Sequence, residues 1–365
     1  MSPVADPGAA PAAGARRVII DTDPGLGEPG SDIDDGLAIA VALRSPELEV
    51  AGLTIVNGNV DAPTGVEVAR DLLDRLGHPD VPVLRGAQQP LVADMAPVRE
   101  IFAAALSGPA PRGAAAPGHA VAADRPRRGP SSPQPAAEFL IEATRADPGA
   151  ISVIAIGPMT NLAAALALDP GFATRVDTFY LMAGSATGYA QNMTVVGDFN
   201  AYVDPEALAM VLASGARVRM VGIDQTSRMM LTRDDAATLR SSGDAFAEYA
   251  GVCTEAWIDF LHAALPSRPE HASACFLHDP LVVAAAIDPA VCAWEPASVQ
   301  VELAGRHTRG LVIADRGLAL QRPAGPPNAD VAVDTDVARG RRLILDRLEG
   351  RPARPGGRPV PSEGE

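Results

Sequence analysis

The sequence has few cysteines, and their spacing excludes two classes of site. Its three cysteines, Cys253, Cys275 and Cys292, are far apart, and no Cys-x-x-Cys pair is present. A zinc site or a dithiol redox centre built on such a pair is therefore excluded. We interpret all three cysteines as small buried apolar residues. The alternative is that Cys275 is a nucleophile with the nearby His278 as its base, since thiolate formation needs such a neighbour.

Positive charge is also scarce. Arg and Lys together number 30 against 45 Asp and Glu, which gives a net charge of −15. No dense cluster of basic residues is present, and binding to phosphate backbones or anionic lipids requires one. We therefore expect neither nucleic acid nor a membrane surface as a partner.

The sequence has no apolar run of membrane-spanning length. Residues 1–15 are rich in Ala, Pro and Gly and lack the cationic start and apolar core of a signal peptide. These features predict a cytoplasmic protein. We expect disordered tails at residues 1–15 and 351–365, and a mobile loop at 107–135, which is rich in Pro, Gly, Ala and Arg. Residues 16–350 are then expected to form a single domain with a large core.

Within that domain, short apolar runs alternate with helical patterns. The expected strands are Arg16–Ile20, Leu48–Val56, Ile151–Ile156, Phe179–Met182 and Val218–Ile223. The expected helices are Gly36–Leu43, Val66–Leu76, Ala136–Arg145, Pro205–Leu212, Asp244–Leu265 and Leu281–Ile287. This alternation predicts an α/β fold with an open, mostly parallel, Rossmann-like sheet flanked by helices. In such folds the active site lies at the carboxyl ends of the strands.

A group of acidic residues follows the first expected strand. Asp21 and Asp23 come directly after it, and Asp34 and Asp35 begin the first helix. Carboxylates placed together at a sheet edge repel one another unless a proton or a cation holds them. A hard divalent ion with oxygen ligands is the simplest partner. The alternative is a solvated turn, because Asp, Pro and Gly are common turn residues.

Polar residues also follow the other expected strands, and they belong at the same edge of the sheet. These motifs are Asn57-Gly58-Asn59, Gly157-Pro158-Met159-Thr160-Asn161, Asn192 with Asp198-Phe199-Asn200, and His278-Asp279. Together with the acidic loop they resemble, in the same order, the calcium-dependent, inosine-uridine preferring nucleoside hydrolases. The resemblance extends to Arg309-Gly310 and Pro327-Asn328, and so spans roughly Arg16–Leu348.

The resemblance implies Ca²⁺ as the cofactor. Asp23 would be both a Ca²⁺ ligand and the general base on a Ca²⁺-bound water. The other ligands would be Asp35, Asp279 and the carbonyl oxygen of Ile156.

The resemblance also implies a ribose site. Asp34 and Asn200 would bind the 2′- and 3′-hydroxyls, and Asn192 and Asp198 the 5′-hydroxyl. Asn59 would lie against the sugar, and His278 would face the departing base.

The implied activity is hydrolysis of the N-glycosidic bond of ribonucleosides to ribose and a free base, by a homodimer or homotetramer. Cleavage of this bond passes through an oxocarbenium-like sugar that nearby carboxylates stabilise. The base leaves more easily when it is protonated or hydrogen-bonded. Two alternatives are a phosphohydrolase of the haloacid-dehalogenase type, whose Asp-x-Asp loop also follows a strand, and a non-catalytic protein that binds ribosyl ligands.

The sequence departs from the family pattern at three places. Leu26–Asp32 is an insertion between the glycine and the Asp34-Asp35 pair, and Asp32 is an additional acid in that loop. Asp198 stands where a Glu is usual, one methylene short of the expected reach. The His-Gly loop expected after Pro90-Leu91, which takes part in base recognition, is not recognisable.

Overall fold

The computed structural model describes residues 14–100, 135–188, 192, 196–317 and 325–351. The predicted tails at 1–15 and 351–365 and the predicted loop at 107–135 lie almost entirely outside these residues. Among the helices that the structure describes, none combines the length and the apolar character needed to cross a bilayer.

Within the described residues, nine strands form one central sheet in the order β10-β9-β11-β6-β5-β4-β1-β2-β3. Strands β1 to β6 and β11 pair in parallel, whereas β9 pairs antiparallel with both β10 and β11. The strands are β1 (Arg16–Thr22), β2 (Leu48–Ile55), β3 (Val83–Arg85), β4 (Ile151–Ala155), β5 (Val176–Met182), β6 (Val218–Val221), β9 (Cys292–Val301), β10 (Val312–Asp315) and β11 (Ala329–Thr335).

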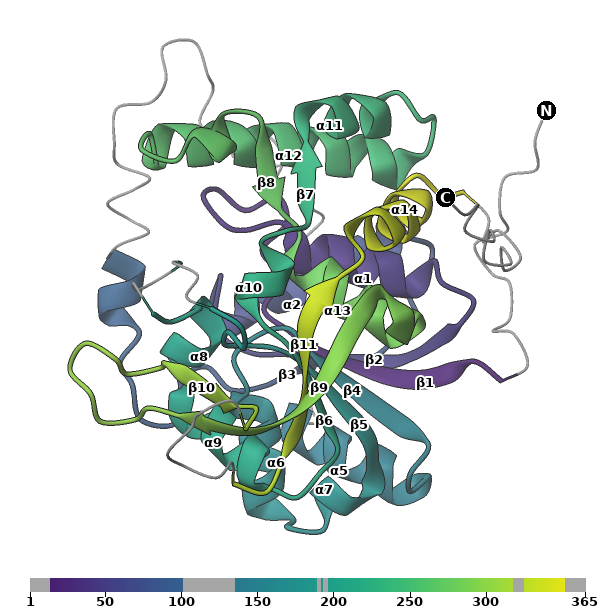
Figure 1. Cartoon of the computed structure of the whole chain (residues 1–365). Coiled ribbons are helices and arrows are strands. Elements are labelled where there is room, and N and C mark those ends of the chain that lie inside the picture. The colour runs from purple at the N-terminus through teal and green to yellow at the C-terminus, as the bar shows by residue number, and fades with distance from the viewer. Residues whose placement is uncertain (1–13, 101–134, 189–191, 193–195, 318–324, 352–365) are drawn as a thin grey trace, which may run out of the picture.

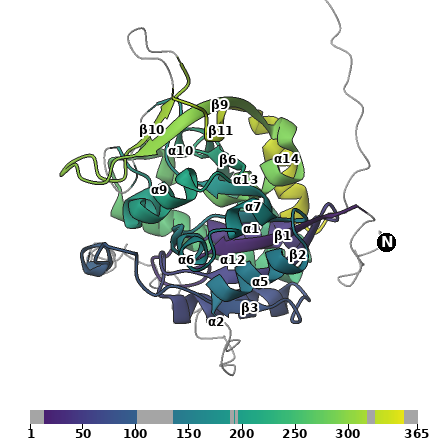
Figure 2. The ribbon, with the colours of Figure 1, turned by 90° about the horizontal axis from the view of Figure 1, so that it is seen from below.

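Helices cover both faces of the sheet, as Figures 1 and 2 show. One face packs against α1 (Asp34–Leu43), α2 (Ala62–Arg75), α13 (His278–Ile287) and α14 (Val337–Leu348). The other packs against α5 (Ala136–Ala146), α6 (Thr160–Leu168), α7 (Phe172–Arg175) and α9 (Pro205–Ala213). Each face therefore has its own apolar core, and strand β4 between them is buried along its whole length.

A smaller unit lies above the carboxyl ends of the strands in Figure 1. It consists of an antiparallel two-stranded sheet, β7 (Met230–Thr232) with β8 (Ala274–Phe276), and of α11 (Arg233–Arg240) and α12 (Ala245–Ala264), which lie between the two strands in the chain. The insertion Leu26–Asp32 reaches this unit, since the Leu26 side chain is buried and the Tyr249 hydroxyl of α12 donates to the Leu26 carbonyl over 3.4 Å.

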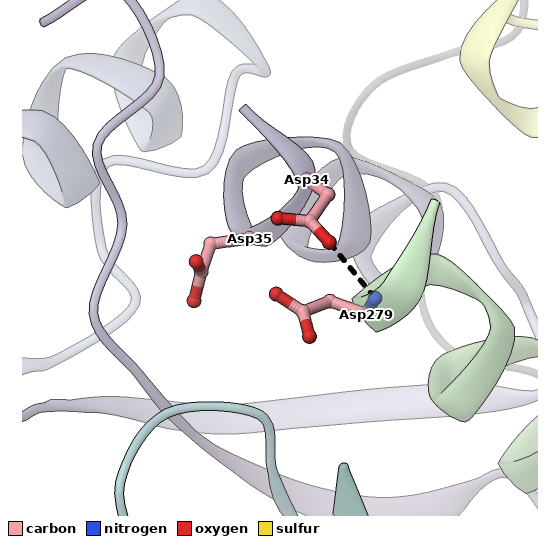
Figure 3. A group of neighbouring side chains, drawn as sticks. All are labelled: Asp34, Asp35 and Asp279. Carbon is pink, nitrogen blue, oxygen red and sulfur yellow. Dashed lines mark hydrogen bonds between the residues drawn. The ribbon is translucent and has the colours of Figure 1, made fainter. Parts of the chain in front are cut away.

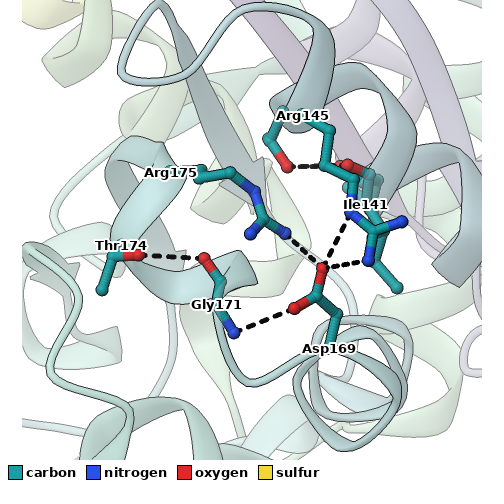
Figure 4. Close-up of polar contacts among 8 residues, drawn as sticks. Ile141, Arg145, Asp169, Gly171, Thr174 and Arg175 are labelled. Atoms are coloured by element: carbon teal, nitrogen blue, oxygen red, sulfur yellow. Dashed lines mark hydrogen bonds and ion pairs between the residues drawn. The ribbon is translucent and has the colours of Figure 1, made fainter.

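An ion-pair cluster ties the helices together at the opposite, amino-terminal end of the sheet (Figure 4). Asp169, which follows α6, accepts from Arg145 of α5 (2.7 Å) and from Arg175 of α7 (2.5 Å). Its second oxygen accepts from the Gly171 amide over 3.0 Å. Although desolvation opposes the charged form, these donors hold the pKa of Asp169 below its usual value.

The fold class that the sequence predicts is confirmed. The expected strands and helices are all present, with ends shifted by a few residues. One larger difference concerns Val218–Ile223, where β6 ends at Val221 and Ile223 begins a short helix, α10 (Ile223–Thr226). The pattern did not predict strands β3, β7, β8, β9, β10 and β11. Of these, β9 and β10 have few buried residues, as expected for antiparallel strands with one solvated face.

Candidate functional site

Four aspartates converge at the point where the strand order reverses. Strand β1 has β2 on one side and β4 on the other, and such a switch point opens a crevice at the carboxyl ends. Asp23 follows β1, Asp34 and Asp35 begin α1, and Asp279 lies in the first turn of α13. Carboxylate oxygens of Asp34, Asp35 and Asp279 lie within 4.8 Å of one another (Figure 3). We call these four residues the acid cup.

The Asp23 carboxylate is enclosed by backbone. Its Oδ2 accepts from the Asn59 amide over 2.6 Å, while its Oδ1 is buried and has no hydrogen-bond partner among the described residues. A Cβ atom at Gly58 would lie 1.9 Å from Oδ2, and one at Gly157 would lie 2.6 Å from Oδ1. The two glycines therefore allow the backbone to approach Asp23 closely, and they leave Oδ1 free for a ligand.

Asp35 and Asp34 are each oriented by hydrogen bonds. Asp35 accepts from the Thr22 hydroxyl, from the Asp23 amide (3.1 Å) and from the Asn59 side-chain amide (2.8 Å). Asp34 Oδ2 accepts from the amides of His278 (3.0 Å) and Asp279 (3.2 Å), at the start of α13. The first turns of α1 and α13 thus position the cup together.

The charges of the cup are not compensated by its surroundings. Burial first, and then repulsion between neighbouring carboxylates, raises the pKa of Asp23, Asp34 and Asp279 well above the usual value. Burial also raises the pKa of Asp35, although hydrogen bonds from Thr22, Asp23 and Asn59 oppose this. Such a cluster keeps all its charges only when a cation enters it. Hard carboxylate oxygens, including the unpartnered Asp23 Oδ1, fit a divalent metal ion.

His278 lies beside the cup, and one of its ring nitrogens is engaged. Nδ1 is 2.7 Å from the hydroxyl of Thr226, a fully buried residue at the end of α10. Nε2 forms no hydrogen bond with the part of the chain that the structure describes. Burial, followed by the nearby His271, lowers the pKa of His278 to about 4. The imidazole is therefore neutral near pH 7 and can donate one hydrogen bond.

The residues expected at the sugar lie after β4 and β5. Asn200, in α8 (Phe199–Val203), donates to the Ile156 carbonyl over 2.7 Å, which brings two predicted site residues together. Asp198 caps α8, because its two oxygens accept from the amides of Gly184 (2.7 Å) and Ala201 (3.2 Å). Asn192 is exposed between segments that are not described.

The structure brings most of the predicted site residues together, and it adds two that the pattern did not assign. One is Asp21, whose Oδ2 accepts from Thr54 (2.5 Å) and Asn161 (2.8 Å), and whose pKa burial raises to about 7. Its position beside Asp23 is a signal in the sequence. The other is Thr226, which no motif marks, since it meets His278 only in the fold.

The alternative role for Cys275 is wrong. Its sulfur is buried, and burial raises the pKa of the thiol well above its usual value, so a thiolate is disfavoured. All three cysteines are buried, as predicted.

Comparisons with known proteins identify the same fold and a family. Residues 18–341 match the family model described as inosine-uridine preferring nucleoside hydrolase. Uridine nucleosidase 1 of Arabidopsis thaliana is 32% identical over 85% of this chain and 85% of its own length. The pyrimidine-specific ribonucleoside hydrolase RihA of Photobacterium profundum is 30% identical over 92% of this chain and 99% of its own length.

Solved structures agree with these relatives. The plant nucleoside hydrolase PpNRh1 superposes with a TM-score of 0.75 at 30% identity, covering 92% of this chain and 99% of its own. A purine-preferring ribonucleoside hydrolase from Gardnerella vaginalis superposes with a TM-score of 0.76 at 30% identity, and the match covers 92% of this chain and 98% of that protein.

The fold, the acid cup and these matches define an enzyme that hydrolyses ribonucleosides to ribose and a free base. The chain belongs to the inosine-uridine preferring nucleoside hydrolase family. The phosphohydrolase alternative is excluded by this membership, and it would also need a lysine beside the Asp-x-Asp loop, whereas the sequence contains no lysine.

Proposed function

We propose that this chain is a Ca²⁺-dependent ribonucleoside N-glycosidase in which Asp23 is the general base and His278 assists the departing base. One observation carries the proposal: a buried carboxylate oxygen, Asp23 Oδ1, has no hydrogen-bond partner and belongs to a cluster of mutually repelling acids. A cation and a water molecule are the partners that this arrangement lacks.

The metal would be held by the donors that the sequence predicts, namely Asp23, Asp35, Asp279 and the carbonyl of Ile156. When bound, Ca²⁺ supplies positive charge that neutralises the carboxylates, anchors the sugar hydroxyls and lowers the pKa of water. Asn59 donates to both Asp23 and Asp35, so it fixes the angle between two of these carboxylates.

Asp23 is suited to remove a proton from the attacking water. Oδ2 is fixed by the Asn59 amide, which leaves Oδ1 to accept the proton. Beside bound Ca²⁺ the Asp23 carboxylate would stay deprotonated, which is the form that a general base requires.

The sugar would lie between the cup and α8. Asp34 and Asn200 are assigned to the 2′- and 3′-hydroxyls, and Asn59 lies against the ring. Asn192 and Asp198 are assigned to the 5′-hydroxyl, Asp198 through lone pairs that its cap contacts with Gly184 and Ala201 leave over. As positive charge develops on the sugar, the carboxylates of the cup stabilise it.

His278 would donate a hydrogen bond to the departing base. When the Thr226 hydroxyl donates to Nδ1, the ring proton lies on Nε2, the nitrogen without a described partner. A neutral imidazole held in this tautomer is a hydrogen-bond donor, and it lowers the cost of charge on the leaving nitrogen or oxygen.

Uridine is the substrate that we propose first, which the names of two relatives support. A panel of uridine, cytidine, inosine and guanosine, assayed for reducing sugar before and after removal of metal with a chelator, tests this. Ribose released from uridine, lost with the chelator and restored by Ca²⁺, supports the proposal. Binding without release of ribose, or turnover that survives the chelator, contradicts it.

We further propose that the enzyme acts in the cytoplasm as a homodimer or homotetramer. The resemblance to the family supports the assembly, and light scattering coupled to gel filtration tests it. A monomer at the enzyme concentration used in the activity assay would contradict it.

A further inference from the structure

A short segment after Pro90 spans two walls of the site. Asp94 accepts from the Ala96 amide over 2.9 Å, and the Arg99 amide donates to the Met95 carbonyl over 2.9 Å, so the segment forms a helical turn. Met95 and Val98 are buried against Val203 of α8, and two further apolar residues of that helix pack beside them. The turn is therefore fixed on the helix that carries Asn200.

The guanidinium of Arg99 reaches the opposite wall, which is the loop after β2. Nη2 donates to the Asn57 side-chain oxygen over 2.7 Å, and Nη1 donates to the Asn59 carbonyl over 3.2 Å. Asn59 in turn donates through its amide to Asp23 and through its side chain to Asp35. A continuous chain of contacts thus runs from Arg99 to two members of the acid cup.

The geometry of this contact suits an arginine and not a lysine. Two donors on one planar group engage two acceptors two residues apart, which a point-like ammonium cannot reproduce. The carboxylates of Asp61 and Asp23 also attract the guanidinium. The positive charge of Arg99 also repels a metal ion. Arg99 therefore has two opposite effects on metal affinity: its hydrogen bonds hold the loop, and its charge opposes the cation.

We infer that Arg99 is a positioning residue, which clamps the loop Asn57–Asn59 so that Asn59 holds Asp23 and Asp35 in the geometry that binds metal. This inference rests on the proposed metal site. It assumes that the gain in metal affinity from positioning Asn59 is larger than the loss from repulsion between Arg99 and the metal ion. Removal of Arg99 should therefore weaken metal binding, even though it removes a positive charge.

Three variants test the inference: Arg99→Met, Arg99→Lys and, as a matched control, Arg85→Met, which removes an exposed arginine from β3. Calorimetric titration with Ca²⁺ is expected to show affinity lower by roughly 10–100-fold for Arg99→Met, the usual effect of removing a group that orients metal ligands. Arg99→Lys should recover only part of it, and Arg85→Met should match the wild type.

Hydrogen exchange of the metal-free protein provides a second readout that needs no Ca²⁺. In Arg99→Met the Asn59 amide should exchange faster, since its acceptor Asp23 no longer faces a fixed loop, while β4 keeps its protection. Unchanged exchange at Asn59, or Ca²⁺ affinity that is unchanged or higher in Arg99→Met, would overturn the inference. If wild-type protein binds no Ca²⁺, the proposed function fails, and the exchange measurement alone decides the role of Arg99.

Discussion

Two groups of charged residues built on aspartate carboxylates lie at opposite ends of the same sheet, and the fold gives them different surroundings. At the amino-terminal end, Asp169 is paired with Arg145 and Arg175, and its pKa is lowered (Figure 4). At the carboxyl-terminal end, Asp34, Asp35 and Asp279 are buried together, and their pKa values are raised (Figure 3). The first group is complete without a ligand, whereas the second needs a positive charge from outside the chain.

The difference separates a structural role from a functional one. Asp169 joins α5, α6 and α7 through contacts that cost little and need no cofactor. We expect the acid cup to destabilise the metal-free protein, because buried like charges oppose folding. Such a cluster persists where binding or catalysis uses it.

The largest expected effect comes from removing one charge from the cup. Asp35→Asn or Asp279→Asn should lower kcat/KM for uridine by on the order of 10³-fold or more, since each removes a carboxylate from the centre of the site. Ca²⁺ affinity should fall with it, which calorimetry measures. Asp169→Asn is the matched control and should retain the wild-type kcat/KM and Ca²⁺ affinity. A similar loss in Asp35→Asn, Asp279→Asn and Asp169→Asn would contradict the difference drawn between the two ends of the sheet.

The next largest effect is expected at His278. His278→Ala should slow hydrolysis of uridine or inosine by on the order of 10²–10³-fold, the range for losing one hydrogen-bond donor to a developing negative charge. Hydrolysis of p-nitrophenyl riboside should stay near the wild-type rate, because nitrophenolate leaves without assistance. Equal losses on the two substrates would show that the substitution disturbs the neighbouring Asp279 and would reject the leaving-group role.

A smaller effect is expected at Thr226, which acts through His278. Thr226→Val removes one hydroxyl at nearly constant shape and should slow uridine hydrolysis by up to about tenfold, the equivalent of about 1 kcal/mol for one hydrogen bond. Thr226→Ser should recover the rate. Nitrogen NMR of His278 should show the proton on Nε2 in the wild type and a mixture of tautomers in Thr226→Val. A wild-type proton on Nδ1 would reverse the assignment.

The smallest effect is expected at Asp198. Asp198→Asn keeps one acceptor oxygen for the cap but loses the second amide contact, so it should lose part of the stability that Asp198→Ala loses, which is about 1 kcal/mol for the cap. Asp198→Asn should lower the preference for uridine over 5′-deoxyuridine by a few fold, roughly the difference between a charged and a neutral hydrogen bond. An unchanged preference would show that Asp198 only caps α8 and does not contact the 5′-hydroxyl.

The sequence predicts the fold class and most of the acid cup well because both follow from local patterns. Buried parallel strands read as continuous apolar runs, as in Ile151–Ala155, and their carboxyl ends must meet at one edge. The residues directly after β1 and at the start of α1 therefore lie at this edge. Asp279 follows β8 of the separate two-stranded sheet, so its place beside Asp23 was implied by the family resemblance and not by the strand pattern.

Contacts between distant segments could not be predicted in the same way. Thr226 and His278 are 52 residues apart, and Arg99 and Asn57 are 42 apart, with no motif to link them. The family resemblance assigns Asp198 to the sugar, but only the fold shows that its carboxylate also accepts hydrogen bonds from the amides of Gly184 and Ala201. The antiparallel strands β9 and β10 were not predicted because one face of each is solvated, which dilutes the apolar pattern.

Thermal unfolding with and without Ca²⁺ tests most directly the claim that the cup is a cation site built at the expense of stability. We predict that metal-free Asp279→Asn is more stable than metal-free wild type, because burial and the neighbouring carboxylates oppose the charge of Asp279. We also predict that Ca²⁺ raises the Tm of the wild type and does not raise the Tm of Asp279→Asn. Asp169→Asn should start below the wild type and gain the same Tm increase from Ca²⁺. A metal-free Asp279→Asn less stable than wild type, together with a wild-type Tm that Ca²⁺ leaves unchanged, would contradict the account.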